Sequence, residues 1–284
     1  MSLQRIQEMN ILVEPAAAAL FEGMHPTAQS RAIERLTSLQ TKPMLLDVVQ
    51  MRRLLLPEAK LIKRIERPTE FSVHDLSAAW SSRFAALQQL LLKRPEMTGT
   101  VSIAAAGGRC TIVGQVKKGK STELEDPTGS IEIITDKQLL PDDVIAATGR
   151  AENGAFRAEE IFFPDIPLRE TTNCSGTLGI NMEGDFMIKP DGTAWWDVGG
   201  LIIMVHKADW NALADQLGVP ASQVPVELLK RRHLAAAPWD LVEQVPDILI
   251  ALGIAETATS YKGTAVIGVQ EKALIDIAAR KVLV

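Results

Sequence analysis

Apolar residues recur at helical spacing through most of the first 96 positions. Pro15 opens a run of helix formers, because a proline in the first turn of a helix gives up no hydrogen bond, and Gly23 ends that run. The pattern predicts helices over residues 15–23, 30–39, 47–56 and 72–94. We therefore expect a helical N-terminal region over residues 1–56.

Residues 57–75 interrupt this pattern with two prolines and a group of basic side chains. The basic residues are Lys60, Lys63, Arg64 and Arg67, with Arg52 and Arg53 just before them. We interpret residues 57–96 as a basic linker followed by a long helix. The linker is either a solvated connection or a strip in which residues such as Lys63 and Arg64 contact phosphates.

After Met97 the spacing changes to short apolar runs separated by turn residues. Strands are predicted at residues 100–103, 110–117, 130–135, 144–148 and 155–163. Asn153-Gly154 is a strong hairpin signal. About five strands within residues 97–170 favour a small closed barrel.

Residues 171–284 contain both apolar runs typical of strands and apolar residues at helical spacing. Strands are expected at 201–205, 246–252 and 264–269, and helices at 208–217 and 225–234, while 274–284 is compatible with either. Alternation of strands and helices favours an α/β layer domain. The fold class expected for the whole chain is α+β with several domains.

Composition narrows the setting of the chain. No apolar stretch approaches the length of a membrane span, the first ten residues are polar, and the two cysteines, Cys110 and Cys174, form no disulfide or metal pattern. We expect a cytoplasmic protein with no membrane partner.

Residues 1–96 carry 13 basic against 10 acidic side chains, whereas residues 97–170 carry 8 against 12 and residues 171–284 carry 9 against 13. Acidic surfaces repel phosphate, so any nucleic acid must be bound by local basic clusters or by a partner.

Several short motifs occur in a specific order. They are Ile112-Val113-Gly114-Gln115-Val116, Glu125-Asp126-Pro127-Thr128-Gly129, Asp143-Val144-Ile145, Phe163-Pro164-Asp165-Ile166-Pro167, Lys230-Arg231-Arg232-His233-Leu234-Ala235, Pro246-Asp247-Ile248 and Tyr261-Lys262-Gly263. Together they resemble the small subunit of archaeal family D DNA polymerase. The resemblance covers residues 97–284 and implies an OB-fold domain followed by a calcineurin-like phosphoesterase domain.

The resemblance also implies a two-metal site, and this chain lacks most of its ligands. Such a site needs a dense set of His, Asp and Asn donors. The histidines are His25, His74, His206 and His233, and none stands in an Asp-x-His, Asn-His or His-x-His pattern. His206 and Asp185 match at most two positions of the family ligand set; the alternative is a buried strand-end histidine and a turn residue. We expect a truncated, degenerate phosphoesterase-like domain with no metal, no cofactor and no catalytic residue.

The barrel segment lacks the features of a single-strand-binding surface. No Phe, Trp or Tyr occurs between Ala85 and Ala155, whereas OB folds that bind single strands stack bases on aromatic rings. The basic side chains Lys117, Lys118 and Lys120 form a cluster that either contacts a phosphate backbone or is simply solvated.

Paired tryptophans, Trp195 and Trp196, precede the first predicted strand of the last domain. They are either core residues or anchors for a protein partner, because tryptophan is enriched at binding hot spots.

These observations favour a non-catalytic scaffold that binds a DNA polymerase large subunit or another replisome protein and contacts DNA indirectly or weakly. Two alternatives stay open: an active 3′–5′ exonuclease small subunit, and a free-standing single-stranded DNA-binding protein.

Overall fold

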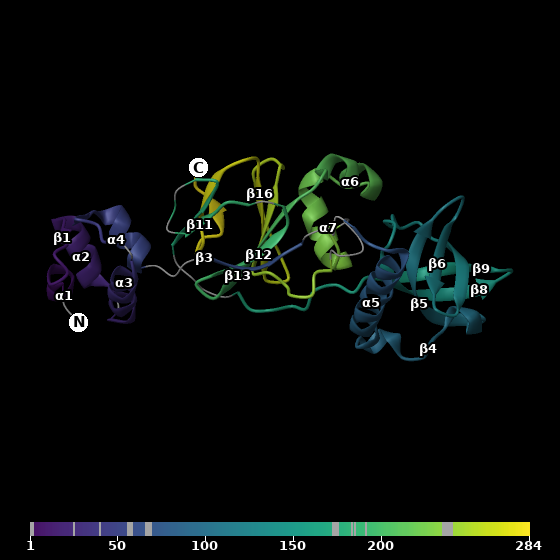
Figure 1. Cartoon of the computed structure of the whole chain (residues 1–284). Helices are drawn as coiled ribbons and strands as arrows, with labels where there is room; N and C mark the ends of the chain where they lie inside the picture. The colour runs from purple at the N-terminus through teal and green to yellow at the C-terminus, as the bar shows by residue number, and fades with distance from the viewer. Residues whose placement is uncertain are drawn as a thin grey trace.

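The computed structural model of the chain describes residues 3–24, 26–39, 41–55, 59–65, 70–171, 176–182, 184, 186–190, 192–234 and 241–284. These residues form a helical N-terminal unit, a β-barrel and a C-terminal unit of sheets and helices (Figure 1). The mixed α+β class predicted from the sequence is confirmed.

The N-terminal unit packs short helices around its own apolar core. Its elements are α1 (Gln4–Gln7), β1 (Leu12–Val13), α2 (Pro15–Gly23), α3 (Pro26–Ser38), β2 (Leu45–Leu46) and α4 (Val48–Leu55). Ile6, Phe21, Leu36 and Met51 bring one buried side chain from each helix into this core. Burial of such side chains contributes roughly 1.5–3 kcal/mol each and holds helices that are too short to be stable alone.

The barrel occupies a stretch that the structure describes without gaps. Its strands are β5 (Gly108–Lys118), β6 (Thr122–Asp126), β7 (Gly129–Ile134), β8 (Val144–Glu152) and β9 (Ala155–Phe162), and β4 (Thr100–Val101) extends the sheet beside β5. The strand order is β5-β6-β7-β9-β8, antiparallel pairing of β8 with β5 closes the ring, and β7 and β9 run parallel. Ile112 and Val116 of β5 point into the barrel core, whereas Val113 between them faces helix α5 (Val73–Leu92).

Helix α5 leads into the barrel and covers its outside. A capping box fixes its start, because Ser72 Oγ accepts from the Asp75 amide at 3.2 Å and Asp75 Oδ2 accepts from the Ser72 amide at 2.9 Å. Phe84, Leu87 and Leu91 in the C-terminal half of α5 pack on Val113, Val144 and Ala146 of β5 and β8.

Two sheets and two helices build the C-terminal unit. Its elements are β10 (Thr177–Ile180), β11 (Phe186–Ile188), β12 (Ala194–Val198), β13 (Leu201–Lys207), α6 (Trp210–Leu217), α7 (Val224–Arg231), β14 (Ile248–Leu252), β15 (Thr257–Tyr261), β16 (Thr264–Val269), β17 (Ala273–Asp276) and β18 (Lys281–Val282). Within the described residues the larger sheet has the order β15-β16-β14-β13-β12-β3, with β13, β14 and β16 parallel, and the smaller has the order β11-β10-β17-β18.

Alternate side chains of the larger sheet pack on its two faces. Ile248 and Ile250 of β14 face the smaller sheet, whereas Leu249 and Ala251 face α6 and α7. The central strand is therefore apolar on both faces, as expected for strands covered on both sides.

The segment predicted as a linker contains a strand of this sheet. Strand β3 (Ala59–Arg64) pairs antiparallel with β12, with Leu61 opposite Trp196 and Arg64 opposite Ala194. The linker prediction did not foresee this strand, because its pairing partner lies far downstream and leaves no local signal; four of its six side chains are exposed, and phosphate contact by Lys63 and Arg64 stays a prediction. Strands β6, β10, β11, β12 and β15 were also missed, and the undecided residues 274–284 form parts of β17 and β18.

None of the helices in the described part of the chain is long and apolar enough to cross a membrane.

Hydrogen exchange tests the pairing of β3. About every second amide of residues 59–64 should exchange slowly, because one side of the strand is bonded to β12 and the other side is open. Strand β14 serves as the fully paired reference in the same measurement. Rapid exchange of every amide in residues 59–64 would contradict the pairing.

Candidate functional site: the polar junction between barrel and C-terminal unit

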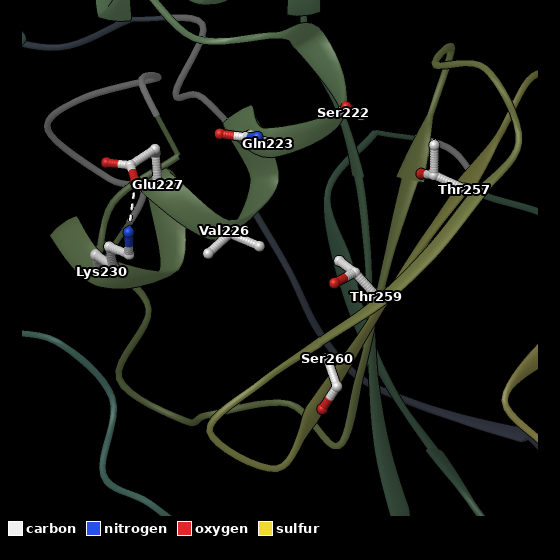
Figure 2. A pocket seen from close by; sticks show the side chains of 8 residues that line it. All are labelled: Ser222, Gln223, Val226, Glu227, Lys230, Thr257, Thr259 and Ser260. Atoms are coloured by element: carbon white, nitrogen blue, oxygen red, sulfur yellow. Dashed lines mark hydrogen bonds and ion pairs between the residues drawn. The ribbon is translucent and has the colours of Figure 1, made fainter.

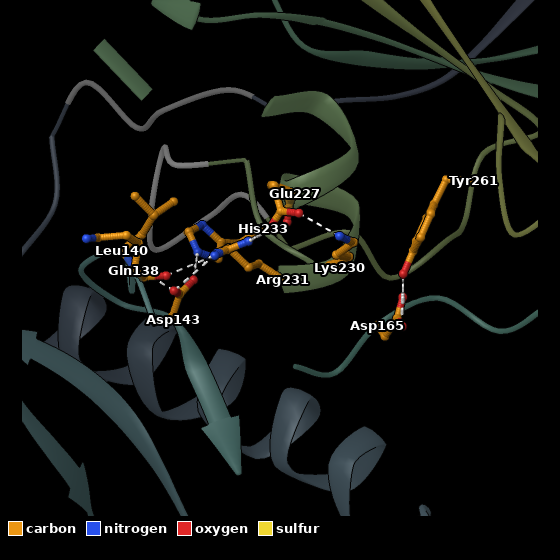
Figure 3. Close-up of polar contacts among 9 residues, drawn as sticks. All are labelled: Gln138, Leu140, Asp143, Asp165, Glu227, Lys230, Arg231, His233 and Tyr261. Carbon is orange, nitrogen blue, oxygen red and sulfur yellow. Dashed lines mark hydrogen bonds and ion pairs between the residues drawn. The ribbon is translucent and has the colours of Figure 1, made fainter. Parts of the chain in front are cut away.

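A buried carboxylate of the barrel lies against the end of helix α7. Asp143, next to the first residue of β8, is fully buried, and its Oδ1 lies 2.7 Å from Nε2 of His233. Its Oδ2 accepts from Arg231 Nε at 3.3 Å and from the Leu140 amide at 2.7 Å. These contacts connect the barrel to the C-terminal unit (Figure 3).

Arg231 has partners for the rest of its guanidinium. Nη1 donates to Glu227 Oε2 at 2.5 Å, and Nη2 donates to the Gln138 carbonyl at 3.2 Å. The group also lies over the ring of Phe163, 4.3 Å from its centroid. Asp143, Glu227, Arg231 and His233 form what we call the inner cluster.

The outer cluster consists of Asp165, Lys230, Tyr261 and Lys262. The Tyr261 hydroxyl donates to Asp165 at 3.0 Å, and Lys262 Nζ donates to the same carboxylate at 2.5 Å. Lys230 Nζ lies 5.5 Å from the Tyr261 ring centroid and bonds Glu227 at 2.6 Å, so the two clusters are continuous. Burial, and then the charge of Asp165, raises the pKa of Tyr261 well above its usual value, which keeps its proton available for donation.

The backbone at this junction requires unusual conformations. Arg232 ends α7 with a positive φ of 57°, which directs its guanidinium to the Asp165 and Val242 carbonyls at 2.7 and 3.0 Å. Gly263 has a φ of 87°, and a Cβ at this position would lie 2.2 Å from the Arg169 carbonyl oxygen. Only glycine fits there, which accounts for the Tyr-Lys-Gly motif.

A polar cleft borders the junction. It has a volume of about 450 Å³ and lies between α7 and the edge strand β15, with hydroxyls from Ser222, Thr257, Thr259 and Ser260 (Figure 2). Glu227 is the carboxylate in its lining. Burial alone would raise the pKa of Glu227, but hydrogen bonds from Lys230 and Arg231 outweigh it and lower the pKa, so this group is a poor proton acceptor.

The junction is arranged to hold two units together. Each carboxylate of the inner cluster already accepts from a cation, and each cation is buried or half-buried beside it. Such a network defines one relative placement of the units, because any other placement leaves a buried charge unmatched. The described residues contain no group of three or more His, Cys, Asp and Glu side chains arranged to hold a metal ion.

Comparison with known proteins identifies relatives. No family model matches the chain. It is 31% identical over 119 residues to the DNA polymerase II small subunit of Methanothermobacter thermautotrophicus, a match that covers 35% of this chain and 25% of that protein. It is 28% identical over 124 residues to the DNA polymerase II small subunit of Archaeoglobus fulgidus, covering 38% and 25%.

This chain is similar to DNA polymerase II small subunits. The resemblance predicted from the sequence motifs is confirmed. The match spans about a quarter of the length of these relatives.

Five of the motifs that suggested the small subunit contribute residues at or beside the junction. Asp143, Asp165, Arg231 and Tyr261 come from four of them, and Asp247 of a fifth accepts from Arg169 at 2.7 Å beside it. The sequence reading treated these residues as marks of a family and missed that they are partners. The available signal was that some of these motifs carry acidic residues, such as Asp143 and Asp165, and others carry basic ones, such as Arg231 and Lys262.

The Asp-Pro-Thr-Gly motif has a separate, local role in the barrel. Asp126 Oδ1 accepts from the amides of Thr128 and Gly129 at 2.7 and 3.1 Å, and Oδ2 accepts from the Ile103 amide at 2.9 Å. The motif thus shapes the turn between β6 and β7 and attaches the segment before β5 to it.

His206 lies inside the C-terminal unit. It is 3% exposed at the end of β13, with Nδ1 2.7 Å from Thr193 Oγ1 and its ring edge-on to Trp210 at 5.3 Å. This is the environment of the buried strand-end alternative. Asp185 lies outside the described residues.

The basic candidates fall on separate elements. Lys117 and Lys118 end β5, Lys120 lies in the following turn, and all three are exposed; Lys117 forms an ion pair with Glu125. Lys63 and Arg64 lie on β3 in the C-terminal sheet, where Lys63 is 3.8 Å from Glu243. The structure does not join these two groups into one surface.

The tryptophan pair packs within β12. Trp195 is only 3% exposed and belongs to the core beneath α6 and α7, and its indole donates to the Gln244 carbonyl at 3.4 Å. Trp196 is half-buried against the opposite core. Trp195 is therefore a core residue, and a role of this pair as an anchor for a protein partner stays a prediction.

Replacing Asp143 tests the inner cluster. Asp143→Asn removes the buried charge between Arg231 and His233 and should lower the free energy of unfolding by about 3 kcal/mol, measured by urea denaturation. The matched control is Glu152→Gln, which breaks the exposed pair with Arg150 and should cost less than about 1 kcal/mol. Equal losses in the two variants would contradict a structural role for the cluster.

The lowered pKa of Glu227 gives a pH dependence. A carboxylate with a depressed pKa in the folded state stabilises the fold above its ordinary pKa, and this contribution is lost as the pH falls through the folded value. The free energy of unfolding should therefore fall below pH ~4.3 more steeply in the natural protein than in Glu227→Gln. Parallel pH profiles for the two proteins would show that the ion pairs of Glu227 contribute nothing.

Proposed function

We propose that the chain is a non-catalytic, small-subunit-like scaffold of an archaeal DNA polymerase or replisome. In this proposal the barrel and the C-terminal unit together form a rigid platform that binds the polymerase large subunit, and DNA is reached indirectly. The similarity to DNA polymerase II small subunits supports an accessory role in replication.

The barrel is proposed to be an OB fold. Its strand order, the closing pair β5–β8 and the parallel pair β7–β9 are those of the five-stranded Greek-key barrel of that class. The barrel segment carries more acidic than basic residues. The aromatic side chain of Phe156 on β9 is fully buried in the barrel core and so offers no platform for a base. A role as a docking element agrees better with these features than autonomous binding of single strands.

The C-terminal unit is proposed to be a reduced phosphoesterase-like domain. Its mixed sheet, second sheet and flanking helices agree with an α/β layer architecture. The pattern of four histidines supplies at most one matching His ligand, and that residue, His206, is packed between Thr193 and Trp210. Two divalent ions need more donors than these.

The observation that carries the proposal is the location of the motifs in which the sequence resembles a small subunit. Asp143, Arg231 and Tyr261 of these motifs hold the barrel to the C-terminal unit instead of converging on an open metal site among the described residues. A junction whose charged side chains already pair with one another fits a protein whose task is to present a fixed surface.

Co-purification and a nuclease assay test the two halves of this proposal. The chain co-expressed with the large subunit of its own organism should co-purify with it through size exclusion. The purified chain should not digest single-stranded DNA in the presence of Mn²⁺, and His206→Ala should behave identically. Manganese-dependent digestion that disappears in His206→Ala would instead establish the exonuclease alternative.

A further inference from the structure

A groove runs between helix α5 and the barrel, outside the junction. Its volume is about 660 Å³, which exceeds that of the cleft beside α7. One wall is formed by α5 from Val73 to Gln88, and the other by the ends of β5 and β6 with the turn that follows β6 and Asp142 before β8. Figure 1 shows α5 lying along the outside of the barrel next to β5 and β6.

The helix wall of the groove is an apolar stripe that no helix or strand of the described residues fills. Val73, Leu76, Trp80 and Phe84 follow one another at spacings of three and four residues, so they lie on one face of α5. Phe84 is buried on the barrel, Leu76 and Trp80 are half-buried, and Val73 is 85% exposed. The stripe is thus part of the core at its Phe84 end and exposed to solvent at its Val73 end. An apolar helix face usually lies against another element along its whole length.

Trp80 has a defined orientation in this wall. The guanidinium of Arg83, itself 3% exposed, lies 5.6 Å from the centroid of the Trp80 ring. A cation at this distance holds an aromatic ring by electrostatic attraction. A large ring held in place loses little entropy on binding and is therefore suited to serve as an anchor.

The barrel wall of the groove is acidic. Its charged residues are Glu125, Asp126, Asp142 and Lys117, a net charge of −2, and Lys117 pairs with Glu125. Burial alone would raise the pKa of Asp126, but hydrogen bonds from Thr128, Ile103 and Gly129 lower it, so this carboxylate is negative at neutral pH. Asp126 and Asp142, the latter bonded by Gln115 at 3.1 Å, are the other carboxylates of this wall, and its net negative charge complements a basic partner and repels phosphate.

We propose that this groove docks an amphipathic helix of a protein partner, with apolar residues against Val73, Leu76 and Trp80 and lysines or arginines toward Asp126 and Asp142. The helical stripe of α5 favours a helix as occupant, because two such stripes pack side by side. A second copy of the groove would oppose its own acidic wall, and nucleic acid would bring phosphates to it. The inference that a protein partner binds here rests on the proposed function, since a scaffold needs a surface for its partners.

Peptide binding to the full chain tests the groove. The probe is a designed fluorescent helix of about five turns with leucines at i, i+3, i+4 and i+7 positions and lysines beside them, and its companion carries glutamates in place of the lysines. Fluorescence anisotropy should show binding of the lysine peptide at least about tenfold tighter than that of the glutamate peptide. Failure of the lysine peptide to bind, or equal binding of both peptides, would overturn the proposal.

Variants locate the binding. Trp80→Ala should weaken the lysine peptide by at least about tenfold, whereas Gln89→Ala, at an exposed position of α5 outside the groove, should not change it. Asp142→Asn keeps the acceptor for Gln115 and suits the positive φ of 70°, so the variant should fold; it should reduce the salt dependence of binding. Unchanged binding in Trp80→Ala would overturn the assignment.

The other occupants give distinct results. Competition by an oligo-dT strand that depends on Trp80 would make the groove a nucleic-acid surface and overturn the proposal. Self-association that Trp80→Ala abolishes in sedimentation would make the occupant a second copy and also overturn it. If the chain does not co-purify with the large subunit but still binds the lysine peptide through Trp80, the proposed function is rejected and the groove proposal stands. If the chain co-purifies with the large subunit but does not bind the lysine peptide, the groove proposal alone is rejected.

Discussion

The carboxylate of Asp143 determines how the halves of this protein meet. It is fully buried and shared by Arg231 and His233, which follow one another closely at the end of α7. Removing charges from water is costly, and the cost is recovered only when partners are placed well and further hydrogen bonds satisfy the remaining atoms. Gln138, Leu140 and Glu227 supply those bonds. The barrel and α7 therefore have one placement in which all of these groups are satisfied.

The rest of the candidate site is built outward from that contact. Lys230 joins the inner cluster to Tyr261 and Asp165, and Arg232 reaches back to the Asp165 carbonyl. The residues of these links come from several segments, so the inner and outer clusters together span the barrel, the segment after β9 and the C-terminal unit. A surface composed of several segments keeps its shape only if these segments do not move relative to one another. The inner and outer clusters are thus the physical basis of the proposed scaffold. The groove beside α5 is a surface that such a scaffold presents.

The sequence predicts the parts of the fold that have local signals. Helices α2 and α5 carry proline or a capping box at their starts, and β13, β14 and β16 are apolar runs, so their periods suffice to find them. Strand β3 has no such signal, because three of its six residues are basic, four are exposed, and the strand it pairs with in the described residues, β12, lies far downstream. The junction was equally hidden: Asp143 and Arg231 lie 88 positions apart, and only the fold brings them together. Trp195 was ambiguous because a buried and an exposed tryptophan look the same in a sequence.

The position of β3 also has a consequence for the order of synthesis. The strand is made before α5 and the barrel, yet the residues opposite it, from Ala194 to Val198, are added more than a hundred positions later. The barrel is thus inserted within the C-terminal unit, and it closes on its own contacts while that unit still lacks most of its sheet. A ribosome-bound chain would carry a finished barrel and an unpaired, positively charged strand at the same time. Pairing with β12 then joins the segments on either side of the barrel in one sheet, so that a strand made early is fixed by one made much later.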